Sequence, residues 1–344
     1  MDMEQNNNHM SEPSRKGRKK VGLIAALVAI VVLVGGYFAF QSHIANEAEI
    51  EIARFLRENQ LDRDIRYREI DASLIGQSVT LYNLRLSLQG TEGTVGALTV
   101  SNYDLDERSG QLRSVDLLLE DVDFPIAASP FGLFGGPSPF LIGMDAMRGD
   151  IGIEYEYDIA KGDVLATVEV SMPDLLDGEF EVSISRFTAP PVERFSARGF
   201  NTMGRMLDDM GKADLNSVSL RLTDRGLKDR IAEYASVETG AALDGAAYRK
   251  ELFHKLDHQI SENPPQSRFE NDMAEVAKSV LDASGGTLKV AYEPQYPTPF
   301  EDIGSAVFEV MFGGFGGLGK QATRNRDALS DMIDRDVLKI EFDS

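Results

Sequence analysis

One stretch of the sequence has the spacing of a phosphate-binding loop. Gly314–Gln321 fits both the GxGxxG and the GxxxxGK patterns, in which glycines let backbone N–H groups approach phosphates. Gln321 stands where such a loop needs a Ser or Thr hydroxyl to bind magnesium. We therefore interpret this stretch as a Gly/Phe-rich loop and predict that the chain binds no nucleotide.

A second stretch has the spacing of a metal site. His254 and His258 are four residues apart, which places two imidazoles on one side of a helix. On a helical wheel they point away from the apolar stripe of Phe253, Leu256 and Ile260, so we expect them to face solvent. The glutamate of an HExxH motif is also missing. We predict no metal site and no cofactor.

Closely spaced carboxylates are the third candidate for chemistry. The pairs are Asp104/Asp106, Asp121/Asp123 and Asp331/Asp334. A calcium loop that starts at Asp104 would need other residues where Arg108, Ser109 and Val115 stand. Because the chain has 56 acidic residues, such pairs arise by chance. We assign no catalytic residue, and a hydrolase whose carboxylates converge only in the fold stays the alternative.

Two segments, 131–142 and 308–318, combine large apolar side chains with glycine and show no regular period. We weigh two interpretations: packing across the end of a sheet, or a surface for acyl chains, the membrane or an apolar partner. The candidate contact residues are Phe131, Leu133, Phe134, Phe140, Phe312, Phe315 and Leu318.

The elements that must position these residues are mostly strands. Tyr82, Leu84, Leu86 and Leu88 alternate with polar residues, which predicts a strand with one dry face. A similar alternation over 151–157 and 164–170, with the turn residues 161–163 between them, predicts a hairpin, and 180–184 extends the pattern. We expect an antiparallel meander with one exposed face.

Helical spacing appears on both sides of these strands. Apolar residues predict an amphipathic helix over 44–58 and further helices between 224 and 282. Two more strands are expected over 288–292 and 338–342. We therefore predict an α+β fold: an N-terminal transmembrane helix, then an antiparallel β-rich exported domain with a helical section near the C-terminus.

The run Val21–Phe40 has no charged side chain and, as a helix, is roughly 30 Å long, which matches the hydrocarbon core of a bilayer. The alternative, a cleaved signal peptide, has a shorter apolar region and small residues at its end, whereas this run ends with Tyr37, Phe38 and Phe40. We predict an uncleaved anchor. The preceding basic residues keep the N-terminus in the cytoplasm and place the rest in the periplasm; they are Arg15, Lys16, Arg18, Lys19 and Lys20.

Composition narrows the function further. The formal net charge is -21, so the surface repels nucleic acid, and no nucleic-acid partner is expected. The chain has no cysteine, which excludes disulfides, thiolate metal sites, a cysteine nucleophile and a lipoprotein anchor.

The order of these features resembles bacterial single-pass envelope proteins of the AsmA-like and YdgA-like type. The resemblance rests on the anchor, on the strand pattern of 73–86 with Gly76, and on the second strand that starts at Gly96. It implies a periplasmic β-rich domain that handles lipid or maintains the envelope.

We accordingly predict a non-enzymatic protein of the bacterial inner membrane. Its partners would be the bilayer, through Val21–Phe40, and a lipid or an envelope protein, through a half-exposed sheet. The alternative is a membrane-tethered periplasmic hydrolase. The predicted regions are a disordered basic cytoplasmic tail (1–20), the anchor (21–41), an amphipathic juxtamembrane helix (42–62), an antiparallel β-rich region (63–222) and a helix-rich region with terminal strands (223–344).

Overall fold

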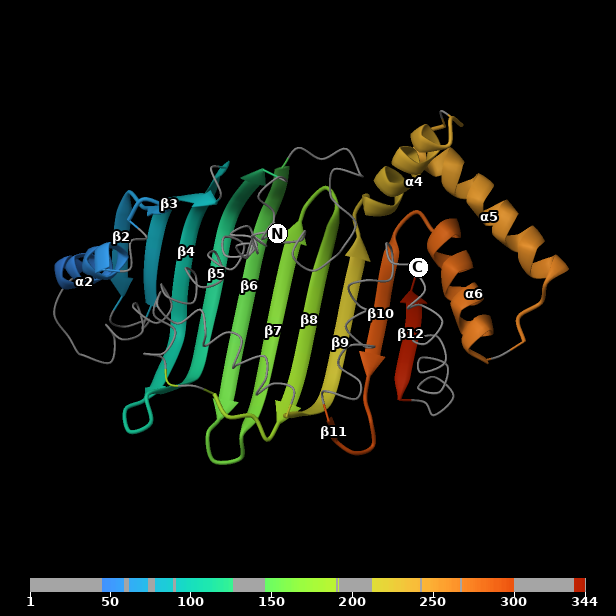
Figure 1. Ribbon diagram of the computed structural model, residues 1–344. Coiled ribbons are helices and arrows are strands. Elements are labelled where there is room, and N and C mark those ends of the chain that lie inside the picture. The colour runs from blue at the N-terminus through green and yellow to red at the C-terminus, as the bar shows by residue number, and fades with distance from the viewer. Residues whose placement is uncertain are drawn as a thin grey trace, which may run out of the picture.

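The computed structural model describes residues 45–58, 62–73, 78–88, 91–125, 146–189, 191, 212–241, 243–266, 268–299 and 337–343. These residues form one twelve-stranded antiparallel sheet with helices at its two ends (Figure 1). In chain order the elements are α2 (Ala45–Glu58), β1 (Ile65–Arg66), β2 (Glu69–Ser73), β3 (Ser78–Leu88), β4 (Thr91–Asp106), β5 (Gln111–Pro125), β6 (Ala146–Asp158), β7 (Asp163–Met172), β8 (Leu176–Ser185), β9 (Asp214–Asp224), α4 (Leu227–Glu238), α5 (Gly245–Glu262), α6 (Arg268–Asp282), β10 (Gly286–Tyr292), β11 (Thr298–Pro299) and β12 (Leu338–Asp343).

The sheet is a meander in which most strands pair with their neighbours in the chain. Its order is β1-β3-β4-β5-β6-β7-β8-β9-β10-β12, with β2 beside β3 and β11 beside β9. The predicted hairpin over 151–170 is confirmed, because β6 and β7 pair around the turn at Lys161 and Gly162. The strands expected over 180–184, 288–292 and 338–342 correspond to β8, β10 and β12.

Alternation gives the sheet one apolar face and one polar face, since residues paired across antiparallel strands point to the same side. A single apolar row crosses the sheet through Val100, Leu117, Ile153, Val168, Phe180, Leu220, Val290 and Ile340. The next row, on the opposite face, consists of Ser101, Asp116, Glu154, Thr167, Glu181, Ser219, Ala291 and Lys339.

Strand β3 departs from simple alternation at Asn83. This residue has a φ of 53°, and the side-chain direction changes there: Leu81 and Leu84 are both 1% exposed on the apolar face. Tyr82 pairs with Ala97 on the opposite face, so the prediction that Tyr82 shares the dry face of Leu84 is wrong. The pairing of β3 with β4 keeps the same register on both sides of Asn83, so its left-handed backbone, and not an inserted residue, changes the phase of the alternation.

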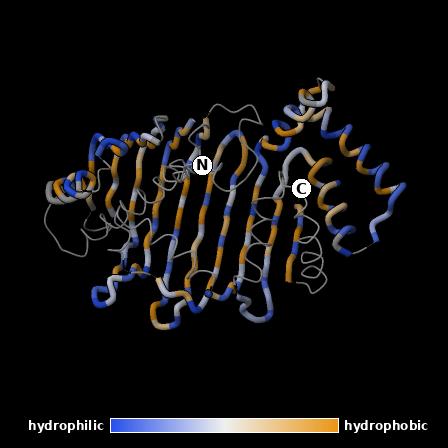
Figure 2. Tube along the Cα trace, viewed as in Figure 1, coloured by the Kyte–Doolittle hydropathy of each residue, from blue (hydrophilic) through white to orange (hydrophobic). Residues whose placement is uncertain are grey.

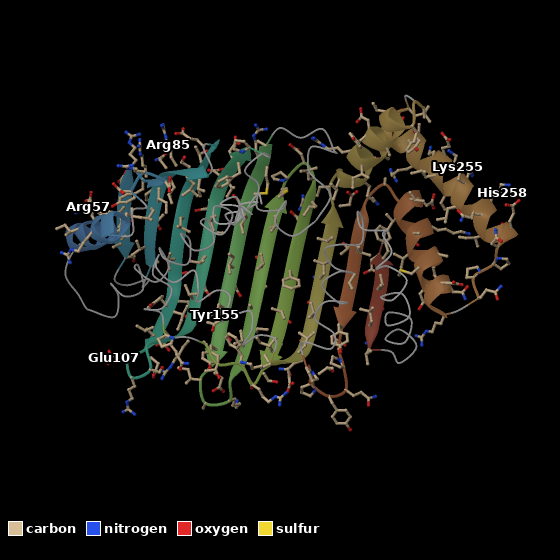
Figure 3. The ribbon with its side chains drawn as sticks, in the orientation of Figure 1. Arg57, Arg85, Glu107, Tyr155, Lys255 and His258 are labelled. Atoms are coloured by element: carbon tan, nitrogen blue, oxygen red, sulfur yellow. The ribbon has the colours of Figure 1, made fainter. Side chains whose placement is uncertain are left out.

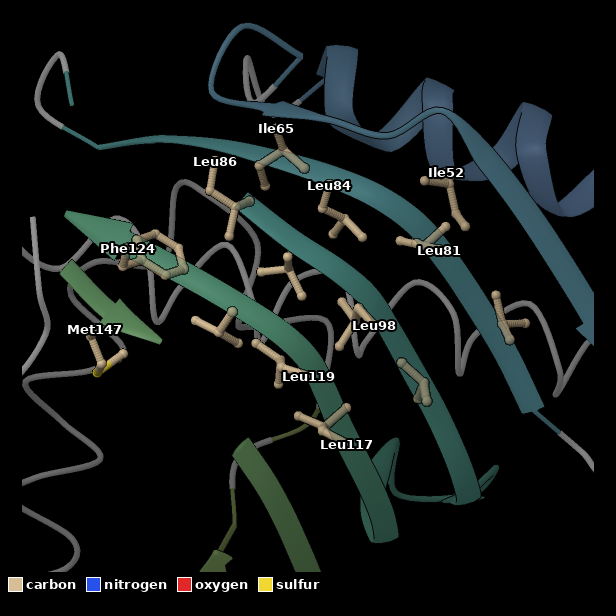
Figure 4. Close-up of a cluster of buried hydrophobic side chains, with 14 of the residues drawn as sticks. Ile52, Ile65, Leu81, Leu84, Leu86, Leu98, Leu117, Leu119, Phe124 and Met147 are labelled. Atoms are coloured by element: carbon tan, nitrogen blue, oxygen red, sulfur yellow. The ribbon is translucent and has the colours of Figure 1, made fainter. Parts of the chain in front are cut away.

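Helix α2 covers the apolar face at the β1–β3 end of the sheet. The amphipathic helix predicted over 44–58 is confirmed by its bounds, and Ile52 and Leu56 are 1% and 4% exposed. Figure 4 shows Ile52 beside Leu81 of β3, within a cluster that continues through Leu98 of β4 to Leu119 of β5. We call this cluster the covered end of the apolar face.

Helices α4, α5 and α6 form an insertion between the paired strands β9 and β10. They lie at the β10–β12 end of the sheet (Figure 1). The buried guanidinium of Arg249 joins all three helices. Its Nε donates to Asp229 of α4 at 2.6 Å, and its Nη1 donates to the carbonyl of Leu281 of α6 at 2.9 Å. Lys228 donates to the carbonyl of Gly285 at 2.8 Å. Cations near a helix C-terminus satisfy its free carbonyls and oppose its dipole.

The predicted fold class, α+β with an N-terminal transmembrane helix, is wrong for the part of the chain that the structure describes. That part is mostly antiparallel β-sheet with few helices, and the strands of both predicted regions, 63–222 and 223–344, belong to the same sheet. The helical pattern after residue 224 belongs to an insertion between two strands of this sheet and not to a second layer.

None of the helices in the described ranges is long and apolar enough to cross a membrane. The predicted span, 21–41, lies outside these ranges.

Candidate functional site: the central part of the apolar face

Among the described residues, the apolar face is less buried at its centre than at its β3–β5 end. Figure 2 shows hydrophobic and hydrophilic residues alternating along the central strands, in keeping with one apolar and one polar face. The apolar side chains of strands β6–β9 nevertheless differ in burial from those of β3–β5, because several are only half-buried. We call six of them the apolar window: Ile151, Ile153, Val168, Val170, Phe180 and Leu222.

The two sides of the apolar window differ in burial. Leu119 and Leu117 of β5, directly across from Ile151 and Ile153, are 4% and 9% exposed. On the other side Leu288 of β10, directly across from Leu222, is half-buried, whereas Val290 is 5% exposed and belongs to a second buried cluster. The window is therefore a less buried part of one continuous apolar face.

Strand geometry sets the size of the window. Four neighbouring strands, β6 to β9, span about 14 Å at the usual separation of about 4.8 Å. One leaflet of a bilayer contributes about 15 Å to the hydrocarbon core, which is the length of an acyl chain lying straight within it. The width of the window is thus close to the length of one such chain laid across the strands.

Tyr155 lies at the edge of the window, at the position labelled in Figure 3. It pairs with Val115 of β5 and with Ala166 of β7, and it packs against both buried clusters. Burial raises the pKa of its hydroxyl above the ordinary value of 10.0. Tyr155 therefore stays neutral at physiological pH and adds no charge to the window.

The opposite face of the same strands carries carboxylates. Glu154 pairs directly with Asp116, and Gly152 pairs with Glu169 on the next strand. Desolvation raises the pKa of Glu154, and the carboxylates of Asp116, Glu169 and Glu156 raise it further. These groups lie on the polar face of the sheet, not beside the apolar window. In the ranges that the structure describes, no three acidic or histidine side chains converge as metal ligands.

The first acidic pair predicted from sequence has a structural role. The carboxylate of Asp106 accepts hydrogen bonds from the backbone N–H and the hydroxyl of Ser109, at 2.9 and 2.7 Å, and so closes the β4–β5 turn. These bonds lower the pKa of Asp106. Arg113 contacts Asp106 at 2.5 Å and Asp104 at 3.7 Å.

In the second pair, Arg148 contacts Asp123 at 3.0 Å. The backbone N–H of Asp121 donates to Asp150 at 2.9 Å, and Asp121 itself has a φ of 52° at a bulge in β5. The pair thus belongs to the pairing of β5 with β6. Asp331 and Asp334 lie outside the described residues.

The two histidines face solvent, as the helical wheel predicts. His254 and His258 are exposed on α5, and Figure 3 shows His258 and Lys255 on the outer side of that helix. His258 lies 3.7 Å from Glu262 of the same helix. Phe253, Leu256 and Ile260 are half-buried on the other side of α5.

The apolar contact residues predicted from the two Phe/Gly segments all lie outside the described residues, as does the Gly314–Gln321 stretch. They are Phe131, Leu133, Phe134, Phe140, Phe312, Phe315 and Leu318. Sequence reasoning placed Ile151, Ile153, Val168 and Phe180 on strands but did not single them out as a site. Alternation identifies the apolar side of a strand, whereas the coverage of that side depends on elements that are distant in sequence.

Comparison with known proteins adds little about function. A family model described as "Uncharacterized protein" matches residues 169–311, which is less than half of the chain. The matched region runs from β7 through the helical insertion and includes two residues of the apolar window beyond β7, Phe180 and Leu222. No curated protein matches the chain.

Proposed function

We propose that this chain is a non-enzymatic lipid-binding protein of the bacterial inner membrane, held there by Val21–Phe40, whose periplasmic sheet takes up a phospholipid acyl chain. The observation that carries the proposal is the apolar window. Its six side chains are half-buried, whereas most apolar side chains of β3–β5 on the same face are almost fully buried. Apolar surface of this kind gains about 0.8 kcal/mol for each ligand methylene that it removes from water.

The position of α2 supports a lipid as the ligand. Four residues separate Phe40, the end of the predicted anchor, from Ala45, where α2 begins. Ile52 of α2 belongs to the same buried cluster as Leu81 of β3, so only a short stretch of sequence separates the predicted anchor from the sheet. A sheet so close to the bilayer is within reach of membrane phospholipid. The resemblance to AsmA-like and YdgA-like proteins points the same way.

The carboxylates do not favour the hydrolase alternative. Glu154 and Asp116 are adjacent on an open polar face, and the acidic pair Asp104/Asp106 is engaged by Arg113. Glycosidase chemistry needs two carboxyl groups on either side of a bound substrate. The apolar window offers no carboxylate to a ligand bound there.

A matched pair of variants on one strand tests the proposal. Val168→Gln places an amide in the apolar window, and Leu165→Gln places the same amide on the polar face of β7, where Leu165 is 38% exposed. Native mass spectrometry of the purified full chain measures the phospholipids retained per protein. Wild type and Leu165→Gln should retain phospholipid that Val168→Gln lacks, with equal circular dichroism. Equal retention in all three proteins would rule out the apolar window as the lipid site.

A further inference from the structure

Two arginines lie opposite each other on the polar face of the sheet, at its β1–β3 end. Arg66 of β1 pairs in register with Arg85 of β3, and both side chains are exposed. Their neighbours Ile65 and Leu86 are buried in the apolar cluster, so the two arginines point to the opposite face. Figure 3 shows Arg85 at this end of the sheet. We call Arg66 and Arg85 the arginine pair.

Backbone hydrogen bonds fix the register on both sides of Arg66. The N–H of Ser87 donates to the carbonyl of Asp64 at 2.7 Å, and the N–H of Arg68 donates to the carbonyl of Tyr82 at 3.0 Å. Residues directly opposite on antiparallel strands have Cβ atoms about 5 Å apart, and like charges at such positions destabilise the sheet. The arginine pair therefore lowers the stability of the fold unless an anion neutralises it.

The arginine pair is an exception among the strand arginines. The others in the described residues each have a carboxylate, at 2.5, 3.0 and 3.8 Å: Arg113 with Asp106, Arg148 with Asp123 and Arg221 with Glu179. Within the described ranges, no carboxylate lies at ion-pair distance from Arg66 or Arg85. Because the chain has 56 acidic residues, two adjacent arginines without a carboxylate leave positive charge available to an anion from outside the chain.

A phosphate group is the anion that suits the arginine pair. The guanidinium group is planar and donates two parallel hydrogen bonds to phosphate oxygens, which a lysine cannot do. Two guanidinium groups on neighbouring strands can therefore share one phosphate. Arg68, two residues after Arg66, is exposed as well and adds a third positive charge beside the pair.

The arginine pair follows the predicted membrane anchor closely in the sequence. Helix α2 begins four residues beyond Phe40 and, with 14 residues, is about 21 Å long. At its end the N–H of Asp62 donates to the carbonyl of Leu56 at 3.2 Å, shortly before β1 begins. The formal net charge of -21 makes most of the surface repel an anionic bilayer, so a local positive group decides which part of the sheet approaches it.

We infer that the arginine pair binds the phosphate groups of anionic phospholipid head groups and thereby orients the sheet on the membrane surface. The inference uses the predicted anchor, Val21–Phe40, but not the apolar window. It gives the polar face a role of its own, since the proposed function concerns only the apolar face. Either assignment can fail without the other.

The experiment measures how fast phenylglyoxal modifies individual arginines of the full chain, reconstituted in phosphatidylcholine vesicles with or without phosphatidylglycerol. Mass spectrometry quantifies the modification of each arginine. Arg66 and Arg85 should react about fivefold more slowly with phosphatidylglycerol present, the effect expected from the attraction of one basic residue to an anionic surface. Arg108 is the control, because it is exposed in the β4–β5 turn, next to the Glu107 labelled at the other end of the strands in Figure 3. Its rate should be the same in both kinds of vesicle.

A matched pair of variants sharpens the test. Arg85→Glu turns the like-charged pair into an ion pair with Arg66, so it should raise the urea midpoint of unfolding and abolish the effect of phosphatidylglycerol on Arg66. Arg108→Glu makes the same change in net charge at the other end of the strands and should keep that effect. The wild-type rates decide the inference even if a variant does not fold.

Three results would overturn the inference. Equal rates at Arg66 and Arg85 in both kinds of vesicle would mean that the arginine pair binds no anionic lipid. Equal slowing at Arg108 would mean that the membrane attracts the domain without using the pair. If inorganic phosphate added to phosphatidylcholine vesicles slows the reaction as much as phosphatidylglycerol does, the pair binds soluble phosphate and does not orient the sheet. In none of these cases does the phospholipid-retention test of the apolar window change its meaning.

Discussion

The covered end and the apolar window belong to the same face of the same sheet, yet they are not equally buried. Leu81 and Leu98 at the covered end are each 1% exposed, whereas Ile153 and Val168 in the window are half-buried. Both pairs occupy equivalent positions of a strand in which apolar and polar residues alternate. Leu81 and Leu98 are buried members of the cluster that includes Ile52 of α2, whereas Ile153 is only a partly buried residue packed against that cluster.

The difference teaches that alternation specifies the direction of a side chain but not its burial. Strands with one dry face need a second layer of some kind, because exposed apolar patches on monomeric proteins are small. At the covered end Ile52 and Leu56 of α2 belong to the buried cluster of that face. In the apolar window we assign the role to a ligand. Substitutions in the two regions can test whether the side chains of the covered end contribute more to the free energy of unfolding than those of the apolar window.

The largest expected effect is at the covered end. Leu98→Ala should destabilise the protein by about 3 kcal/mol, because it leaves a cavity in a well-packed cluster. Ile153→Ala in the window should cost only about 1 kcal/mol, since its side chain is partly in contact with water already. Urea unfolding followed by circular dichroism measures both. Equal losses at the two positions would contradict the comparison and indicate that the window is part of the packed core.

The sequence pattern correctly predicted the strands because their signals are local. The β6–β7 hairpin follows from two alternating runs around Lys161 and Gly162, and α2 from apolar residues at helical spacing. The fold class was wrong for a non-local reason. The helical pattern after 224 resembles one half of an α+β protein, whereas pairing of β9 with β10 makes the helices an insertion in a single sheet.

The site was only partly predictable for similar reasons. A half-exposed sheet was expected, but the burial of each strand depends on residues distant in sequence: Ile52 of α2, which joins the buried cluster of β3–β5, lies about a hundred residues before Ile153.

Two tyrosines near the margins of the face offer a finer comparison. The hydroxyl of Tyr157 donates to the carbonyl of Phe187 at 3.1 Å, so Tyr157→Phe should cost about 1 kcal/mol. The hydroxyl of Tyr103 is buried without a hydrogen-bond partner among the described residues, so Tyr103→Phe should be neutral or stabilising by up to about 1 kcal/mol. Thermal unfolding at neutral pH measures both. A loss at Tyr103 as large as at Tyr157 would show that its hydroxyl is paired after all.

Tyr103 also predicts that the stability of the folded protein depends on pH in the alkaline range. Burial raises the pKa of Tyr103 from 10.0 to about 12, so the folded protein holds the proton more tightly than the unfolded chain does. Stability must therefore fall as the pH rises from 10 towards 12. Tyr103→Phe removes this term, and the variant should lose less stability than wild type over that interval. Parallel pH curves for the two proteins would refute the assignment.

The smallest effect is expected on the polar face, behind the apolar window. Glu154 follows Ile153 in β6, and its pKa is raised by desolvation and then by Asp116, Glu169 and Glu156. An acid whose pKa is higher in the folded state binds its proton more tightly there, so the folded state is favoured at low pH and loses stability as the pH rises above 4.5 through the folded pKa. Glu154→Gln cannot ionise, so its stability relative to wild type should increase with pH across that interval.

Because Glu154 lies on an exposed surface, the gain from Glu154→Gln at neutral pH should not exceed about 0.5 kcal/mol. The measurement compares urea unfolding of both proteins at several pH values, so that carboxylates distant from Glu154 contribute equally to each. Lipid retention provides the second readout. If the ligand binds on the apolar face, Glu154→Gln should leave phospholipid retention unchanged, because Glu154 lies on the opposite face. Its neighbour in β6, Ile153, belongs to the apolar window. A loss of retention in Glu154→Gln would mean that the polar face takes part in binding, and the division of the sheet into two functionally separate faces would fail.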